Sequence, residues 1–274
     1  DIDLNENLKF IGGVDLRTYT GYHYTEVTDL LGGAYAFDDS DVNRPNNAAK
    51  VGDIINYNND GEVGWQGVFT QLEYDKDRWS AFISLAASNT SYVRVDNFLL
   101  DSDPLQRTDK SSFFGYSAKG GANFRIDDKH NVFANIGYFE KAPTFRAFES
   151  GQHDNAAVNP DADNEKVFSA EIGYGFRGEK FAANVNIYRT QWDDRFLSKP
   201  FTAQSGDRFN ASILGVNALH QGVEVDFTYR TTDKITFTGM LSLGDWEWAN
   251  NLTDAPVFDE DQNQVGTVNL FIEG

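Results

Sequence analysis

The stretch Val223-Glu224-Val225-Asp226-Phe227-Thr228-Tyr229-Arg230 alternates apolar and polar side chains without a break. A period of two places successive side chains on opposite faces of a strand, whereas a helix needs a period of about 3.6. The tetrapeptide Thr231-Thr232-Asp233-Lys234 follows, and residues 235–243 then alternate in the same way. The pattern predicts two strands joined by a tight turn.

The same alternation occurs along most of the chain. It flanks tight turns at residues 75–77, 127–130 and 177–180, and it marks a first strand from Leu8 and a last one near Val265. We count about ten strands by this template. The composition of 22 Phe and 12 Tyr with one Met also favours pleated strands. The predicted fold class is therefore all-β and antiparallel.

Connections between the predicted strands alternate between tight turns and long segments. The long segments cover residues 22–61, 95–111, 142–164, 196–219 and 249–264. Outer-membrane β-barrels have short periplasmic turns and long external loops, whereas soluble sandwiches spread their loops over both ends. The pattern predicts the wall of a transmembrane β-barrel in the cell outer membrane.

Charge, cysteine content and the length of apolar runs exclude several classes of protein. A formal net charge of −19 argues against nucleic-acid binding, which needs clustered Lys and Arg. Because the chain has no Cys, it has no disulfide framework, thiolate zinc site or cysteine nucleophile. No run approaches the ~20 apolar residues of a spanning helix. A barrel strand needs no such run, because it alternates lipid-facing and lumen-facing side chains.

Charged residues in the middle of the predicted strands all occupy the polar register. In a barrel this register faces the lumen, where charge meets water or a plug. An ordinary solvated sheet face would show the same register, but the one-sided loop pattern favours the lumen. The predicted lumen-facing residues are Asp15, Arg17, Lys119, Arg125, Glu171, Glu224, Asp226 and Arg230.

We predict no metal site, no cofactor and no catalytic residues. Residues 56–61 weakly resemble a calcium loop, but the acidic residue that closes such a loop is not in place. Ser150 and His153 lie close together in one predicted loop. No nucleophile elbow, phosphate loop or helical metal motif accompanies them. The chain is therefore predicted not to be an enzyme.

Three motifs resemble those of TonB-dependent outer-membrane receptors, particularly of the Bacteroidetes type. Lys141-Ala142-Pro143-Thr144-Phe145 is similar to the family's R-A-P-T-F, with Lys141 in place of Arg. Residues 159–174 are similar to N-P-x-L-x-P-E followed by E-x-G, with Ala162 and Asn164 in place of Leu and Pro. Residues 220–225 are similar to the x-x-G-x-E strand opening that comes next. Residues 13–33 also resemble a barrel strand that leads into an external loop of this family. The resemblance therefore covers nearly the whole chain and lies in the barrel.

This resemblance implies a receptor that takes up a scarce nutrient through a plugged barrel, driven by the TonB complex. The nutrient classes of the family are siderophores, haem, cobalamin, peptides and glycans. Such barrels have roughly 22 strands, so residues 1–274 are expected to form a partial barrel domain without plug and terminal strands. Outer-membrane lipid and a surface lipoprotein are further expected partners. Loop aromatics would contribute to the pocket, and the candidate substrate-binding residues are Tyr22, Tyr24, Phe148 and Phe201.

Two other interpretations fit the same alternation. The first is a passive porin, or a smaller outer-membrane barrel that closes with about ten strands. The second is a soluble β-sandwich that binds carbohydrate and has one solvated sheet face. A second sheet packed against Val223, Val225 and Phe227 would contradict the transporter interpretation.

Overall fold

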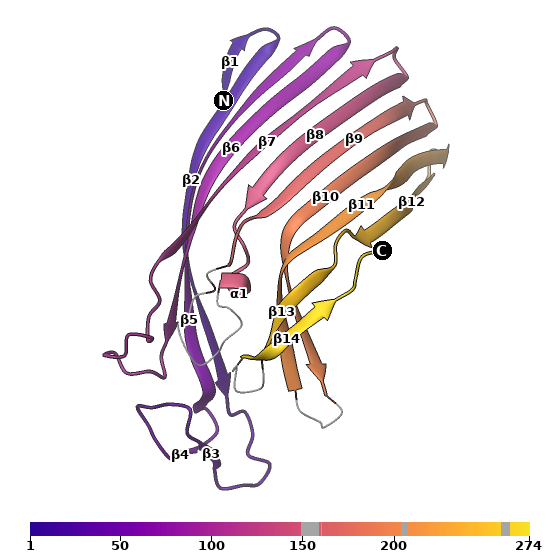
Figure 1. Cartoon of the computed structure of the whole chain (residues 1–274). Helices are drawn as coiled ribbons and strands as arrows, with labels where there is room; N and C mark the ends of the chain where they lie inside the picture. The colour runs from indigo at the N-terminus through magenta and orange to yellow at the C-terminus, as the bar shows by residue number, and fades with distance from the viewer. Residues whose placement is uncertain (149–158, 160, 204–207, 259–263) are drawn as a thin grey trace.

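The computed structural model consists almost entirely of strands (Figure 1). It describes residues 1–148, 159, 161–203, 208–258 and 264–274. In this part of the chain the one helix is α1 (Phe145–Phe148), and no helix is long and apolar enough to cross a membrane. The strands are β1 (Ile2–Asn5), β2 (Leu8–Glu26), β3 (Ala36–Asp38), β4 (Asn47–Ala49), β5 (Ile54–Lys76), β6 (Trp79–Asp96), β7 (Ser111–Arg125), β8 (His130–Lys141), β9 (Glu165–Arg177), β10 (Phe181–Thr202), β11 (Arg208–Thr232), β12 (Ile235–Trp248), β13 (Leu252–Phe258) and β14 (Gln264–Leu270).

Twelve of the described strands form one antiparallel sheet in the order β1-β2-β5-β6-β7-β8-β9-β10-β11-β13-β14, with β12 also beside β11. Strand β12 pairs with β11 from Ala218 to Thr232, whereas β13 pairs with it at Asn210 and Ala211. The two strands thus lie one after the other along the same edge of β11. Figure 1 shows a curved, open wall. The all-β antiparallel prediction is confirmed.

The connections are sorted by length between the two ends of the sheet. Short turns join β5 to β6, β7 to β8, β9 to β10 and β11 to β12, and they lie at the upper end in Figure 1. The β3–β4 pair, the last residues of β10 and the first residues of β11 lie at the opposite end. The predicted asymmetry between the two ends is present in the fold.

Segment 196–219, predicted as a long loop, is largely strand, and segment 22–61 is strand at both of its ends, so the loop prediction is wrong there. Strands β10 and β11 continue as a hairpin to Thr202 and from Arg208, through most of segment 196–219. Strand β2 likewise runs to Glu26. Register shifts interrupt the ladder between Trp192 and Leu197 on β10. A bulge moves the following side chains to the other face, so a search for strict alternation loses the strand at that point.

The two faces of the main sheet differ in chemistry. Val223 lies opposite Ile187 on β10 and Leu243 on β12, and Val225 lies opposite Leu241. We call the side that carries these residues the apolar face. Many of its apolar side chains are exposed, among them Val223 at 38%, Ile187 at 57% and Leu243 at 66%. The only other sheet in the described residues is the β3–β4 pair, so a packed soluble sandwich is not supported.

Aromatic rings gather on the apolar face close to the short turns. The rings of Trp79 and Phe124 lie 4.6 Å apart, centroid to centroid. Phe181 lies 6.2 Å from Phe176 and 6.4 Å from Tyr229. Outer-membrane barrels carry girdles of aromatic residues at both edges of their apolar band. The rings mark where such a band would end on this sheet.

Candidate functional site

The eight predicted lumen-facing residues all lie on the side opposite the apolar face, which we call the polar face. Glu224 lies opposite Asn186 on β10 and Ser242 on β12, while Glu171 lies opposite Asn135 on β8. The register of each strand places the others on the same side. The full set is Asp15, Arg17, Lys119, Arg125, Glu171, Glu224, Asp226 and Arg230.

Uncharged donors on neighbouring strands hold the carboxylates of β9 and β11. Asn135 Nδ2 donates to Glu171 at 2.8 Å, and Asn184 Nδ2 donates to Asp226 at 3.0 Å. Glu224 accepts longer bonds of 3.5 Å from an amide on β10 and a hydroxyl on β12. These partners carry no positive charge, so they do not neutralise the three carboxylates that they hold.

Arg17 on β2 and Arg125 on β7 have local partners. Arg17 Nε donates to Asp15 at 3.0 Å, and the guanidinium lies 5.1 Å from the ring centroid of Trp65. Arg125 donates to the backbone oxygen of Asp77 at 2.6 Å, next to a short turn. These two arginines are therefore held by local partners, whereas amide and hydroxyl groups hold the carboxylates of β9 and β11.

A cavity of about 810 Å³ opens on the polar face near the short turns. Strands β1, β2 and β5 to β8 line it, and its charged or amide side chains include Lys9, Glu73, Lys119 and Asn135. These groups can form hydrogen bonds with water or with a polar protein surface.

Tryptophans and cations gather on the polar face nearer the long loops. The guanidinium of Arg195 lies 5.1 Å from the ring centroid of Trp192 and 5.8 Å from that of Trp248. Lys141 Nζ lies 5.8 Å from the Trp192 ring and forms a 2.7 Å salt bridge with the buried Glu165. We call Lys141, Trp192, Arg195 and Trp248 the tryptophan–cation cluster. A cavity of about 500 Å³ adjoins it, lined by residues of β5 to β10.

Aromatic packing attaches the short helix α1 to the polar face (Figure 1). Phe148 is 0% exposed, with its ring 5.5 Å from that of Tyr92 and 5.3 Å from that of Phe145. Tyr92 Oη donates to the backbone oxygen of Pro143 at 2.8 Å. The segment after β8 is therefore anchored to β6 by both apolar and polar contacts.

A family model described as "TonB dependent receptor-like, beta-barrel" matches residues 1–270. The chain belongs to this family of outer-membrane receptors. No curated protein sequence matches it.

Two solved structures show the same receptor fold. One is titled "Copper transporter OprC", with 16% identity and a TM-score of 0.64 over 88% of this chain. Another is the FrpB iron transporter from Neisseria meningitidis (F3-3 variant), with 15% identity and a TM-score of 0.54 over 95% of this chain. This chain covers 35% of the length of each. At these identities the likeness shows the fold alone.

The four candidate substrate-binding residues fall in three separate places on the receptor wall. Register places Tyr22 and Tyr24 on the apolar face, where Tyr22 is 70% exposed. Phe201 stacks on Phe209 at 5.6 Å near the tip of the β10–β11 hairpin. Phe148 is fully buried and presents no surface to a ligand. Contact of these residues with substrate stays a prediction.

The tryptophan–cation cluster is not among the residues predicted from sequence. Trp192 is four residues after Tyr188 on β10, and an even spacing along a strand places both side chains on the same face, here the polar face. Arg195 gives no such signal, because register shifts flank it on both sides. Counting residues cannot tell which face it joins.

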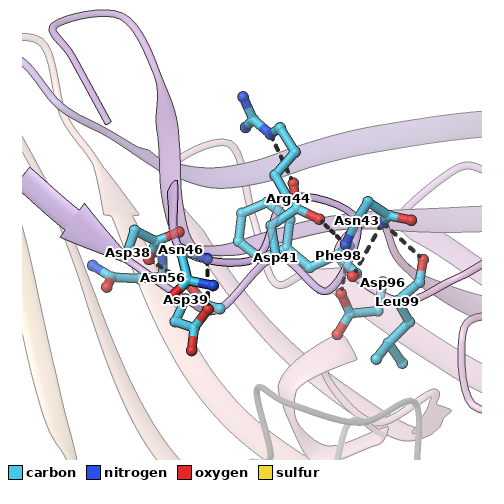
Figure 2. A network of polar contacts seen from close by, with 11 residues as sticks. Asp38, Asp39, Asp41, Asn43, Arg44, Asn46, Asn56, Asp96, Phe98 and Leu99 are labelled. Carbon is cyan, nitrogen blue, oxygen red and sulfur yellow. Dashed lines mark hydrogen bonds and ion pairs between the residues drawn. The ribbon is translucent and has the colours of Figure 1, made fainter. Parts of the chain in front are cut away.

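Hydrogen bonds join the long loop after β2 to the loop after β6 in the receptor barrel (Figure 2). Asn43 Nδ2 donates to the backbone oxygens of Phe98 at 3.2 Å and Leu99 at 3.4 Å. Arg44 Nε donates to Asp41 at 3.0 Å in the same loop. The two connections therefore form one polar assembly at the long-loop end.

The segment that weakly resembles a calcium loop takes part in this assembly. Asn56 N donates to Asp38 at 3.2 Å, and Asn97 Nδ2 donates to Asp60 at 3.0 Å. These oxygens hold the loops together. In the part of the chain that the structure describes, no three His, Asp or Glu side chains gather as a metal site would require. Ser150 and His153 lie outside the described residues.

Proposed function

We propose that this chain forms part of the wall of a TonB-dependent transporter that takes up a scarce nutrient across the outer membrane. In this proposal the apolar face contacts lipid, and the polar face looks into an aqueous lumen that holds a plug. The wall catalyses no reaction and uses no cofactor. Energy for uptake comes from the TonB complex.

The exposed apolar face is the observation that carries this proposal. Ile172 on β9, Ile187 on β10 and Leu241 on β12 are 60%, 57% and 58% exposed, and they continue as a band across neighbouring strands. Soluble monomers rarely expose contiguous apolar patches of more than a few hundred Å². Exposing such a band to water costs free energy, whereas lipid acyl chains solvate it without that cost.

The polar face supports the proposal of a lumen with a plug. Carboxylates such as Glu171 and Asp226 sit in the middle of strands, where lipid contact would be costly and water or a polar domain would not be. The 810 Å³ cavity on the same face gives such a domain a concave surface. Closing the wall needs further strands, since barrels of this type have roughly 22. Residues 1–274 are proposed as a partial barrel domain of a longer protein.

The substrate is proposed only as a scarce nutrient of small or oligomeric size. The two similar structures are titled as a copper transporter and an iron transporter, and the family resemblance adds siderophore, haem, cobalamin, peptide and glycan. The joined loops of Figure 2 would form part of the outer entrance and of a docking surface for a surface lipoprotein.

Spin-label accessibility on β10 tests which face meets lipid. The chain has no Cys, so single-cysteine variants of the full-length receptor carry one label on this part of the wall. Ile187→Cys should be accessible to lipid-soluble oxygen and shielded from a water-soluble nickel chelate. Asn186→Cys, one residue away on the polar face, should show lower oxygen accessibility. Equal accessibility at both positions would contradict the proposal.

Dependence on TonB separates an active transporter from a porin. Nutrient-limited growth that needs this receptor should stop when TonB is deleted, although the receptor stays in the outer membrane. Growth that continues without TonB would support the passive porin instead.

A further inference from the structure

Arg195 occupies an unusual position on the polar face. Its guanidinium lies between the rings of Trp192 on β10 and Trp248 on β12. Between these rings, β11 contributes Ala218, which lies opposite both tryptophans in register and is 2% exposed. A small side chain at this position leaves room for a guanidinium above it. Asp194, just before Arg195, has a positive φ of 59° in the irregular stretch that directs the arginine inward.

The local charge balance of the cluster is positive. Lys141 lies over the same Trp192 ring and has one carboxylate partner, Glu165. In the described part of the chain Arg195 has no salt bridge to a carboxylate; its contacts there are the two rings. A local excess of positive charge is notable in a chain of net charge −19.

The geometry leaves the donors of Arg195 available. Among the described residues the guanidinium of Arg195 donates no hydrogen bond, so its five N–H groups can reach a ligand. The planar fork of these groups matches the two oxygens of a carboxylate or phosphate. The rings of Trp192 and Trp248 therefore position the guanidinium, and its hydrogen-bond donors have no acceptor among the described residues.

The cluster lies toward the long-loop end of the sheet. Arg195 is eight residues after Ile187 on β10, about 26 Å along the strand at ~3.3 Å per residue. The cavity of about 500 Å³ beside Trp192 adds aromatic and small side chains of five further strands. A solute that enters from the long-loop end would reach this height before the half of the wall that carries the short turns.

We propose that the tryptophan–cation cluster is a binding subsite for an anionic group, a carboxylate or a phosphate, of the transported nutrient. Arg195 donates a bidentate pair of hydrogen bonds to the anion, Lys141 adds a second positive charge, and Trp192 gives an apolar surface for the body of the nutrient. This inference rests on the proposed transport function and restricts its substrates to anions.

Calorimetric titration of the full-length receptor in detergent micelles tests the subsite. The probes are citrate, inorganic phosphate and, as a neutral solute, glucose. Wild type should bind at least one anion and not glucose, and the preferred anion identifies the group as carboxylate or phosphate. Arg195→Gln should weaken anion binding at least about tenfold, because charge-assisted hydrogen bonds are lost. Arg195→Lys keeps the positive charge but not the planar fork. Its affinity for the anion should lie between those of wild type and Arg195→Gln.

Arg189→Gln is the matched control. Arg189 is an exposed arginine of the same strand on the other face, so its replacement should leave anion binding unchanged. Lys141→Gln serves as a second test variant, should Arg195→Gln fail to fold. Its side chain is 55% exposed, and anion binding should again fall. Absence of anion binding by wild type, or equal binding by wild type and Arg195→Gln, would overturn the subsite.

The failure of this inference differs from the failure of the proposed function. Equal spin-label accessibility at positions 186 and 187 would contradict the proposed function, whatever the titrations show. If the accessibilities differ as expected but Arg195→Gln binds anions as wild type does, the proposed subsite is wrong and the proposed transporter wall is still supported.

Discussion

The indole nitrogen of Trp246 donates a hydrogen bond of 2.9 Å to the hydroxyl of Tyr188, across the intervening strand β11. Gly222 lies beneath this bridge, opposite both Tyr188 and Gly244 in register. A Cβ added at Gly222 would meet the hydroxyl of Tyr188 at 3.0 Å and the backbone oxygen of Leu243 at 2.5 Å. The absence of a side chain at Gly222 allows the close approach of three strands.

Gly222→Ala should therefore destabilise the barrel. The clash involves backbone atoms of β12, which cannot rotate away as a flexible side chain would. Overpacking of this kind costs about 1–3 kcal/mol of unfolding free energy. Urea unfolding of the full-length receptor in lipid vesicles, followed by tryptophan fluorescence, measures the loss.

Gly266→Ala on β14 is the control, because a Cβ at Gly266 would meet no atom within 4 Å. Its unfolding midpoint should equal that of wild type. A stable Gly222→Ala variant would show that β11 and β12 separate more readily than their register indicates.

A charge placed on the apolar face should be costly. Ile172 lies in the centre of the apolar series of β9, opposite Ile187 on β10. Ile172→Arg should lower the unfolding free energy in lipid vesicles by about 2–4 kcal/mol, because the cation would face acyl chains near the middle of the bilayer.

Asn186→Arg gives the comparison at the same height on the polar face. Asn186 lies opposite Glu224 on β11, so an arginine there would meet a carboxylate and should change stability little. A similar loss in both variants would mean that the two faces do not differ in environment.

Alternation alone predicts much of this fold. In an unbroken strand, residues at even spacing share one face of the sheet and residues at odd spacing lie on opposite faces. Val223 and Glu224 needed no structure to be assigned to opposite sides. The same counting from Leu16 would have placed Tyr22 and Tyr24 on the apolar face, but their expected position in a loop hid it, since β2 continues past them.

Counting residues along a strand does not predict the face of a side chain after a register shift. It also does not predict which side chains of different strands become neighbours. Arg195 follows a shift in β10, so its face depends on backbone conformation that composition does not reveal. Trp192 and Trp248 become neighbours only because Ala218 of β11 lies between them. Sites built across strands therefore required the pairing of the whole sheet.

Phe148 should act in packing. Phe148→Ala would leave a cavity against Tyr92 and Phe145, at a cost of about 3–5 kcal/mol to the local structure. Hydrogen exchange of the peptide covering residues 142–148 should accelerate, because the amide of Ala147 is bonded within this turn to Thr144.

Phe201→Ala, at the hairpin tip, should leave exchange in that peptide unchanged. If Phe148→Ala also left exchange unchanged and abolished uptake, the side chain would contact substrate and the packing role would be wrong.

Asp127 should make the stability of the β7–β8 turn depend on pH. Its carboxylate accepts the backbone N–H groups of Lys129 at 2.8 Å and His130 at 2.9 Å. The bond from Lys129 is the main cause that holds the pKa of Asp127 below its usual value of 3.8. A group with a lowered pKa in the folded state contributes stability above the unfolded pKa and loses it as the pH falls through the folded pKa.

Asp127→Asn keeps an acceptor oxygen but removes the charge, so its unfolding midpoint should lie below that of wild type at pH 7. The difference should shrink progressively below pH 3.8, and a difference that stays constant over this range would show that the charge of Asp127 does not stabilise the turn.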